Sequence, residues 1–143
     1  MKPVYLDYNA TTPLDPRVIE AMRPYLENHF GNPSSTHWYG VRAKKAVEEA
    51  RKRVATLLGC RTEEVIFTSG GSESNNFAIK GAAYANRDKG NHIITTSIEH
   101  PAVVEVCRYL EKHGFRITYL PVDGYGLLDI SDLETAISGE TVL

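Results

Sequence analysis

The chain has 143 residues, about the size of one domain, with 42% hydrophobic and 24% charged residues, which is ordinary for a globular protein with a buried core. Sixteen basic and eighteen acidic side chains leave a formal charge of −2, so charge favours neither a nucleic-acid nor a membrane partner. The N-terminus turns polar before an apolar signal core could form, and no run of about eighteen apolar residues occurs. We therefore expect a cytoplasmic protein.

The first half of the chain is expected to be helical. Asp15 followed by Pro16 is typical of a helix start, and helical spacing continues to Gly31, with Pro24 expected to kink or split this helix. The turn-forming loop "GNPSSTH" follows. The next segment carries apolar residues at three- and four-residue steps, which predicts an amphipathic helix that ends near Gly59.

The second half alternates strands and helices. Strands are expected at 64–69, 92–97 and 115–122. Helices are expected at 73–89, from Pro101 to Gly114, and after a cap at Ser131. The last residues, "TVL", look like the start of a further strand, and this apolar end leads us to expect a truncated chain. Such alternation predicts an α/β fold with a mainly parallel sheet and helices on both faces.

The two cysteines, Cys60 and Cys107, lack CxxC or Cys/His ligand spacing. The sequence therefore predicts neither a metal site nor a disulfide framework. We expect both residues to be buried structural thiols.

The stretch "TSGGSESNN", residues 68–76, carries the first candidate site. A strand that passes through Gly70-Gly71 into a helix would direct the free N–H groups of the first turn at an anion, with the Ser72 hydroxyl as a further donor. The stretch has no P-loop lysine and no third glycine for a dinucleotide fingerprint, so both nucleotide motifs are excluded. The motif alone leaves two interpretations open: a phosphate cradle, or a tight turn in which Ser72 is only an N-cap and Glu73 favours the helix dipole.

His100 is the second candidate. It lies in "TSIEHPAV", between a strand end and a helix that begins at Pro101, and thus at the carboxyl edge of the expected sheet. A purely structural role is the alternative, as for any lone histidine. Four other histidines have no such position, namely His29, His37, His92 and His113.

The string "YLDYNATTP", residues 5–13, is the third feature. It is polar and turn-rich and follows only a few apolar residues. It is either a plain N-terminal arm or a segment whose Asn9, Thr11 and Thr12 line a cleft.

Taken together, "YLDYNATTP", "GNPSSTH" with "FTSGGSESNN", and "IITTSIEHPAV" resemble the cysteine desulfurases of the NifS/IscS type, within the class V aminotransferases. These enzymes use pyridoxal 5'-phosphate (PLP), and the resemblance covers essentially the whole chain. It implies PLP-dependent fold type I, an aspartate-aminotransferase-like architecture. An N-terminal arm would occupy residues 1–14, and residues 15–143 would be the N-terminal half of the PLP-binding large domain.

The resemblance also implies roles for individual residues. Gly71 and Ser72 would bind the PLP phosphate through backbone N–H groups and the Ser72 hydroxyl. His100 would stack on the pyridine ring and help to move protons. Asn9, Ala10 and Thr11 would approach the substrate side of the pocket.

Other family motifs do not occur in this sequence. They are the acidic partner of the ring nitrogen, the "SxHK" string with the Schiff-base lysine, the arginine for the substrate carboxylate and the mobile persulfide cysteine. Lys80 has no preceding histidine and is not assigned as that lysine. Neither Cys60 nor Cys107 resembles an exposed, low-pKa thiolate.

The implied reaction converts L-cysteine to L-alanine and an enzyme persulfide that supplies sulfur for iron–sulfur clusters. The implied partners are a second subunit, since intact relatives are homodimers, and a sulfur-acceptor or scaffold protein. The 143-residue chain alone is expected to be inactive. Two alternatives stay open: a non-catalytic fragment or split-enzyme half that acts as a binding module, and a related class V enzyme such as a selenocysteine lyase.

Overall fold

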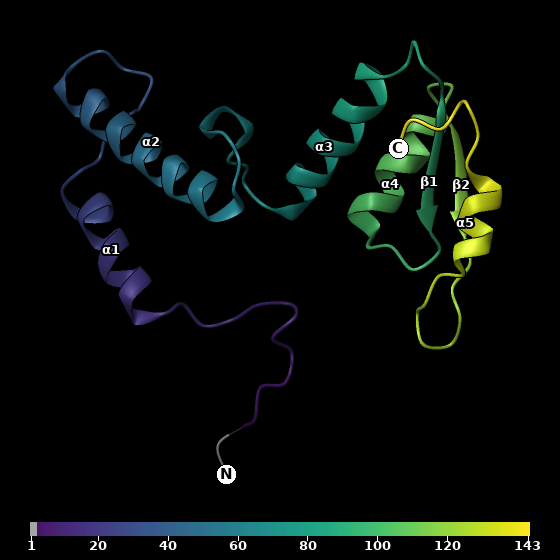
Figure 1. Cartoon of the computed structure of the whole chain (residues 1–143). Coiled ribbons are helices and arrows are strands. Elements are labelled where there is room, and N and C mark those ends of the chain that lie inside the picture. Colours follow the sequence, from purple (N-terminus) through teal and green to yellow (C-terminus); the bar gives the residue numbers. More distant parts are fainter. Residues whose placement is uncertain (1–2) are drawn as a thin grey trace. The chain divides into compact units, whose positions relative to one another are not determined.

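The computed structural model describes residues 3–143, which form two compact units (Figure 1). The first unit ends at Ile66 and the second is Phe67–Leu143. Each unit has its own secondary structure. The expected division into an arm, 1–14, and a domain, 15–143, stays a prediction.

The first unit is helical. Its elements are α1 (Pro16–Glu27), α2 (Trp38–Leu58) and a single 3-10 turn, η1 (Thr62–Glu64). Asp15 caps α1, because its carboxylate accepts the Arg17 N–H at 2.8 Å. Gly59 ends α2 in the left-handed region, with φ 67°, a conformation that glycine adopts without steric cost. Both boundaries confirm the predictions from sequence.

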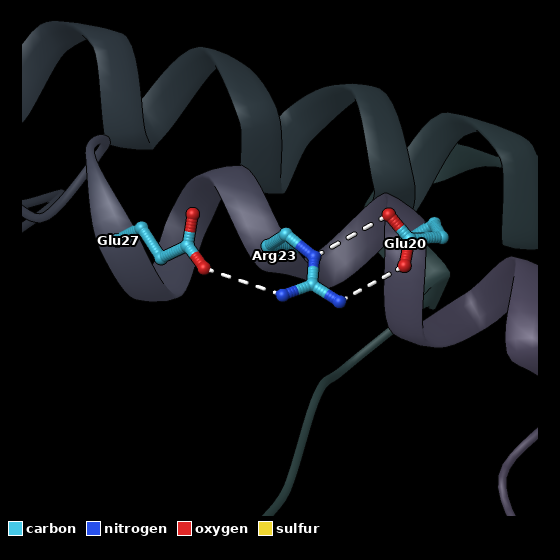
Figure 2. A network of polar contacts seen from close by, with 3 residues as sticks. All are labelled: Glu20, Arg23 and Glu27. Carbon is cyan, nitrogen blue, oxygen red and sulfur yellow. Dashed lines mark hydrogen bonds and ion pairs between the residues drawn. The ribbon is translucent and has the colours of Figure 1, made fainter.

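Helix α1 continues across Pro24, so the expected split does not occur. Figure 2 shows an ion-pair network that spans this proline: Arg23 lies 2.9 Å from Glu20 and 3.4 Å from Glu27. These i,i+3 and i,i+4 pairs join two successive turns of the helix. They link the turn before Pro24 to the turn after it, where proline removes one backbone hydrogen bond.

The second unit is α/β. Its elements are α3 (Gly71–Ala85), β1 (His92–Thr96), α4 (Pro101–Glu111), β2 (Arg116–Leu120) and α5 (Ile130–Ala136). Strands β1 and β2 pair in parallel, in register from His92↔Arg116 to Thr96↔Leu120. The final residues add to the other edge of β1 through a parallel bridge between His92 and Thr141. The predicted beginning of a strand at 141–143 is therefore confirmed as a bridge.

Helices cover both faces of this sheet, as predicted. On one face Ile93 and Ile117 pack in a core with residues of α3 and α4: Ile79, Ala83, Val106 and Leu110. On the other face Ile94 and Leu120 line a groove together with Leu133 and Ile137, at and just after α5. Because side chains alternate between faces along a strand, the neighbouring residues Ile93 and Ile94 lie on opposite faces of the sheet.

The prediction of a strand at 64–69 is wrong. Residues 62–64 form η1, and residues 65–69 are not in a strand. The Val65 carbonyl accepts a hydrogen bond from the Arg51 guanidinium. A β-branched run becomes a strand only beside a hydrogen-bonded neighbour, and within residues 3–143 the sheet is built from β1 and β2.

Two smaller expectations also need correction. Helix α5 is capped by Asp129, whose carboxylate accepts both the N–H of Ser131 at 2.9 Å and its hydroxyl at 2.8 Å, so Ser131 is not the cap. Helix α3 ends at Ala85, earlier than expected, with Asn86 as its C-cap. In both cases a neighbouring Asp or Asn satisfies the free backbone groups at the helix end.

No helix in residues 3–143 combines the length and the apolar character needed to cross a membrane. Cys107 is buried, as predicted, whereas Cys60 is only partly so. Burial raises the pKa of the Cys107 thiol, and the nearby Glu111 and Glu99 add to this effect.

Candidate cofactor site

The candidate residues of the second unit lie at the starts of two helices. Figure 1 shows α3 and α4 beginning toward the end of the sheet at which the β1 and β2 arrows point. The two helices pack against each other. Gly71 and Ser72 open α3, and His100 immediately precedes α4. This end, the carboxyl edge of a parallel sheet, is where α/β proteins bind ligands.

The first turn of α3 presents unused donors. Gly70 is the N-cap residue and makes no side-chain cap. Ser74 donates its N–H to the Gly70 carbonyl at 3.0 Å, so the N–H groups of Gly71, Ser72 and Glu73 precede the first intrahelical bond. Gly70 is the N-cap and Ser72 lies inside α3, so the expectation that Ser72 caps this helix is wrong. Within residues 3–143 the Ser72 hydroxyl makes no hydrogen bond, and its role in holding a phosphate stays a prediction. These donors and the positive end of the helix dipole together suit an anion.

Neither glycine is required by the packing of the chain. A Cβ built on Gly70 or Gly71 would meet nothing within 4 Å, and neither residue lies in the left-handed region, since the backbone of Gly70 is extended, with φ 164°. Because glycine has no Cβ, the space in front of these two backbone amides stays open. The open space before these residues fits a ligand that approaches the backbone closely.

Glu73 shapes the loop before the cradle. Its carboxylate accepts the backbone N–H of Ser69 at 2.6 Å and the Ser69 hydroxyl at 2.7 Å. The backbone hydrogen bond, followed by the hydroxyl, lowers the pKa of the Glu73 carboxyl below its usual range. From the sequence, Glu73 was expected only to favour the helix dipole. The capping-box spacing, Ser or Thr three residues before Glu, does not occur here because Gly70 occupies that position, so the sequence carried no signal for this contact.

His100 is exposed and serves as the N-cap of α4. Its Nδ1 accepts the N–H of Ala102 at 3.0 Å, so in the neutral ring the proton lies on Nε2. The capping bond fixes the ring at the helix start and leaves Nε2 as the nitrogen available to a ligand. A histidine can therefore cap the helix and contact a cofactor at once.

The arm residues Asn9, Ala10 and Thr11 belong to the first unit and are exposed. The N–H groups of Ala10 and Thr11 donate to the Asp7 carbonyl at 3.1 and 3.5 Å, which closes a turn. Their approach to a substrate stays a prediction.

The donor set of the second unit suits the phosphate of PLP. Gly71 and Ser72 would hold the phosphate through two N–H groups and a hydroxyl, and His100 would offer a flat ring for the pyridine. Among residues 3–143 no cluster of three His, Cys, Asp or Glu side chains could hold a metal ion.

The model of the class V aminotransferase family matches residues 4–143, nearly the whole chain. The chain belongs to the class V aminotransferase family. It is 56% identical over 140 residues to cysteine desulfurase IscS of Dictyoglomus turgidum, a match that covers 98% of this chain and 36% of that protein. It is 53% identical over 144 residues to a cysteine desulfurase of Rattus norvegicus, covering 100% of this chain and 32% of that protein.

Solved structures of the family agree. A NifS-like protein superposes with a TM-score of 0.89 at 41% identity, over 96% of this chain and 38% of that one. The structure of SspA in complex with cysteine gives a TM-score of 0.85 at 42% identity, over 96% of this chain and 40% of that one. These class V relatives are PLP-dependent, and the predicted family, fold class and cofactor are confirmed. The chain spans about a third of the length of the curated relatives that it matches.

Proposed function

We propose that this chain supplies the phosphate-binding and ring-stacking part of the PLP site of a cysteine desulfurase. One observation carries the proposal: the free donors of Gly71 and Ser72 and the ring of His100 lie at the starts of two packed helices. The 56% identity to a cysteine desulfurase supports it.

Each residue has a distinct task in this proposal. The N–H groups of Gly71 and Ser72 and the Ser72 hydroxyl bind the phosphate at the positive end of α3. His100 stacks on the pyridine ring, and its Nε2 holds or moves a proton, since its Nδ1 is occupied by the Ala102 N–H. Bound PLP supplies an electron sink for bond cleavage at the substrate amino acid.

The net reaction transfers one sulfur atom. L-cysteine and an enzyme thiol give L-alanine and an enzyme persulfide, so the bond from carbon to sulfur breaks and one between two sulfurs forms. Cys107 is unsuited to be that thiol, because it is buried and its pKa is raised. Asn9, Ala10 and Thr11 would line the substrate side. A homodimer, a sulfur-acceptor or scaffold partner and a cytoplasmic location belong to the same proposal.

The test is a titration of the ¹⁵N-labelled chain with PLP, with pyridoxal, which lacks the phosphate, and with inorganic phosphate. We expect PLP and phosphate to shift the amide signals of Gly71 and Ser72, and pyridoxal to leave these two signals unchanged. PLP that leaves both amides in place, or shifts only signals elsewhere, would contradict the proposal.

A second candidate function follows from the absence of an "SxHK" lysine string in this sequence: a non-catalytic binding module, or half of a split enzyme. In that case borohydride traps no PLP on a lysine of the chain, and no sulfide is released from cysteine. We expect this result for the chain by itself. Trapped PLP or released sulfide would instead assign the complete reaction to these 143 residues.

A further inference from the structure

We propose that Glu73 is a positioning residue of the phosphate cradle: its carboxylate ties Ser69 to the first turn of α3 and so fixes the direction of the Gly71 and Ser72 N–H groups. This inference rests on the proposed function, because it concerns the same phosphate. It adds a residue that itself need not touch the cofactor.

The tie consists of two short hydrogen bonds from one residue. The N–H and the hydroxyl of Ser69 both donate to Oε2 of Glu73, at 2.6 and 2.7 Å. Hydrogen bonds to an ionised carboxylate are about twice as strong as neutral ones. They close a ring across Gly70 and Gly71, the two residues between the tied ends that have no side chain.

A second tie flanks the same glycine. The hydroxyl oxygens of Thr68 and Ser74 lie 2.6 Å apart. Each of them is also within hydrogen-bonding distance of the Gly70 carbonyl, at 3.3 and 3.2 Å. The loop before α3 is thus held by polar side chains from both of its ends.

The ties can restrict this loop because it is exposed and contains two glycines. Glycine has the widest choice of backbone conformations, and a Cβ at Gly70 or Gly71 would find open space. Ser69, Gly70 and Gly71 are all exposed. Without the ties the N–H groups would have to be ordered when the phosphate binds, and that ordering lowers affinity.

Two possible roles of Glu73 predict opposite changes in phosphate affinity when this residue is removed. A carboxylate in the first turn stabilises the helix, yet it repels a phosphate bound at the same helix end. If Glu73 acted only by its charge, its removal would tighten phosphate binding. If it positions the cradle, its removal weakens binding.

The experiment compares the variants Glu73→Ala, Glu73→Gln and Ser69→Ala in the 143-residue chain. Asp132→Asn is the matched control, because Asp132 is likewise an acidic residue in a first helical turn, that of α5. The measurements are PLP, phosphate and pyridoxal affinities and the hydrogen-exchange protection of the Ser69 amide.

We expect Glu73→Ala to remove the protection of the Ser69 amide and to weaken PLP and phosphate binding about tenfold, with pyridoxal affinity unchanged. Glu73→Gln keeps an acceptor and loses the charge, so its loss is smaller. Ser69→Ala keeps the backbone hydrogen bond and gives an intermediate loss. The control Asp132→Asn binds PLP like the parent chain.

Equal or tighter PLP binding by Glu73→Ala overturns the inference, as does an equal loss of PLP and pyridoxal affinity. If Glu73→Ala is unfolded, Ser69→Ala decides, and unchanged PLP affinity in that variant overturns the inference. If the parent chain itself shows no phosphate-dependent shift at Gly71 and Ser72, the proposed function fails and this inference fails with it. If the parent chain shows this phosphate-dependent shift and Glu73→Ala shows the same shift, the inference about Glu73 fails and the proposed function stands.

Discussion

His92 and Thr141, far apart in the sequence, are joined by a 2.8 Å contact between Nδ1 and Oγ1. The opposite ring nitrogen, Nε2, lies 2.8 Å from Oγ1 of Thr118. The imidazole is fully buried and connects β1, β2 and the final residues of the chain. It therefore links the three segments of the sheet through side chains in addition to the backbone.

This arrangement predicts a stability that falls in mild acid. Desolvation by burial lowers the pKa of His92 from its ordinary value of 6.5, and the positive charge of Arg116 adds to the effect. Between the folded pKa and 6.5 the unfolded chain binds more protons, so the free energy of unfolding rises with pH there. We expect it to be greatest above pH 6.5 and to decrease as the pH falls through that window toward the folded pKa.

Urea unfolding at several pH values measures this dependence. His92→Gln removes the titrating ring and should flatten the curve in the window below neutrality. His113→Gln is the control, because it replaces an exposed histidine and leaves the contacts of His92 in place. A parent chain whose stability is the same on both sides of this window would contradict the assignment.

Local signals in the sequence predicted much of this fold. Asp15-Pro16 and Gly59 set helix ends through contacts within a few residues, and both were found as expected. The segment 64–69 failed for a physical reason: a strand depends on a neighbour, and the sequence of one segment does not name its partner. Instead, a distant arginine, Arg51, binds the Val65 carbonyl.

The candidate site likewise combines features that depend on nearby residues with features that depend on distant ones. The positions of Gly71, Ser72 and His100 at helix starts could be predicted because the sequence marks these helix starts, whereas their contacts with a cofactor stay a prediction. The tie between Ser69 and Glu73 was missed, since it depends on the path of the loop through two glycines. The buried role of His92 was missed as well, because it depends on residues from two other segments, Thr118 and Thr141.

The ion pairs across Pro24 predict a small, salt-sensitive contribution. Arg23→Ala removes both of its pairs, with Glu20 and Glu27, and should lower the free energy of unfolding only slightly, since exposed pairs of this type are weak. The difference from the parent chain should shrink in about 1 M salt, which screens exposed charges. Thermal unfolding at two salt concentrations checks this, and a salt-independent loss would point to packing of the Arg23 stem instead.

Two glycines predict opposite effects of the same substitution. Gly71→Ala should leave the free energy of unfolding unchanged or raise it by up to about 1 kcal/mol, because the Cβ meets open space and alanine favours a helix. Gly90→Ala should be destabilising, because its Cβ would lie 2.7 Å from the Glu140 Cα and push the final residues away from β1. Denaturant unfolding of both variants tests this. Equal changes in the free energy of unfolding would contradict the open surroundings of Gly71 and the crowded surroundings of Gly90.

The two tasks of His100 can be separated by a pair of variants. His100→Asn keeps a good helix cap and lacks the aromatic ring, so stability should be close to that of the parent chain while PLP and pyridoxal affinities both fall. His100→Ala loses the cap as well, and should cost about 1 kcal/mol in addition to the same loss of binding. Thermal unfolding and ligand titration distinguish these outcomes. Full PLP affinity in His100→Asn would show that the ring serves α4 alone, and would return His100 to the purely structural role that the sequence left open.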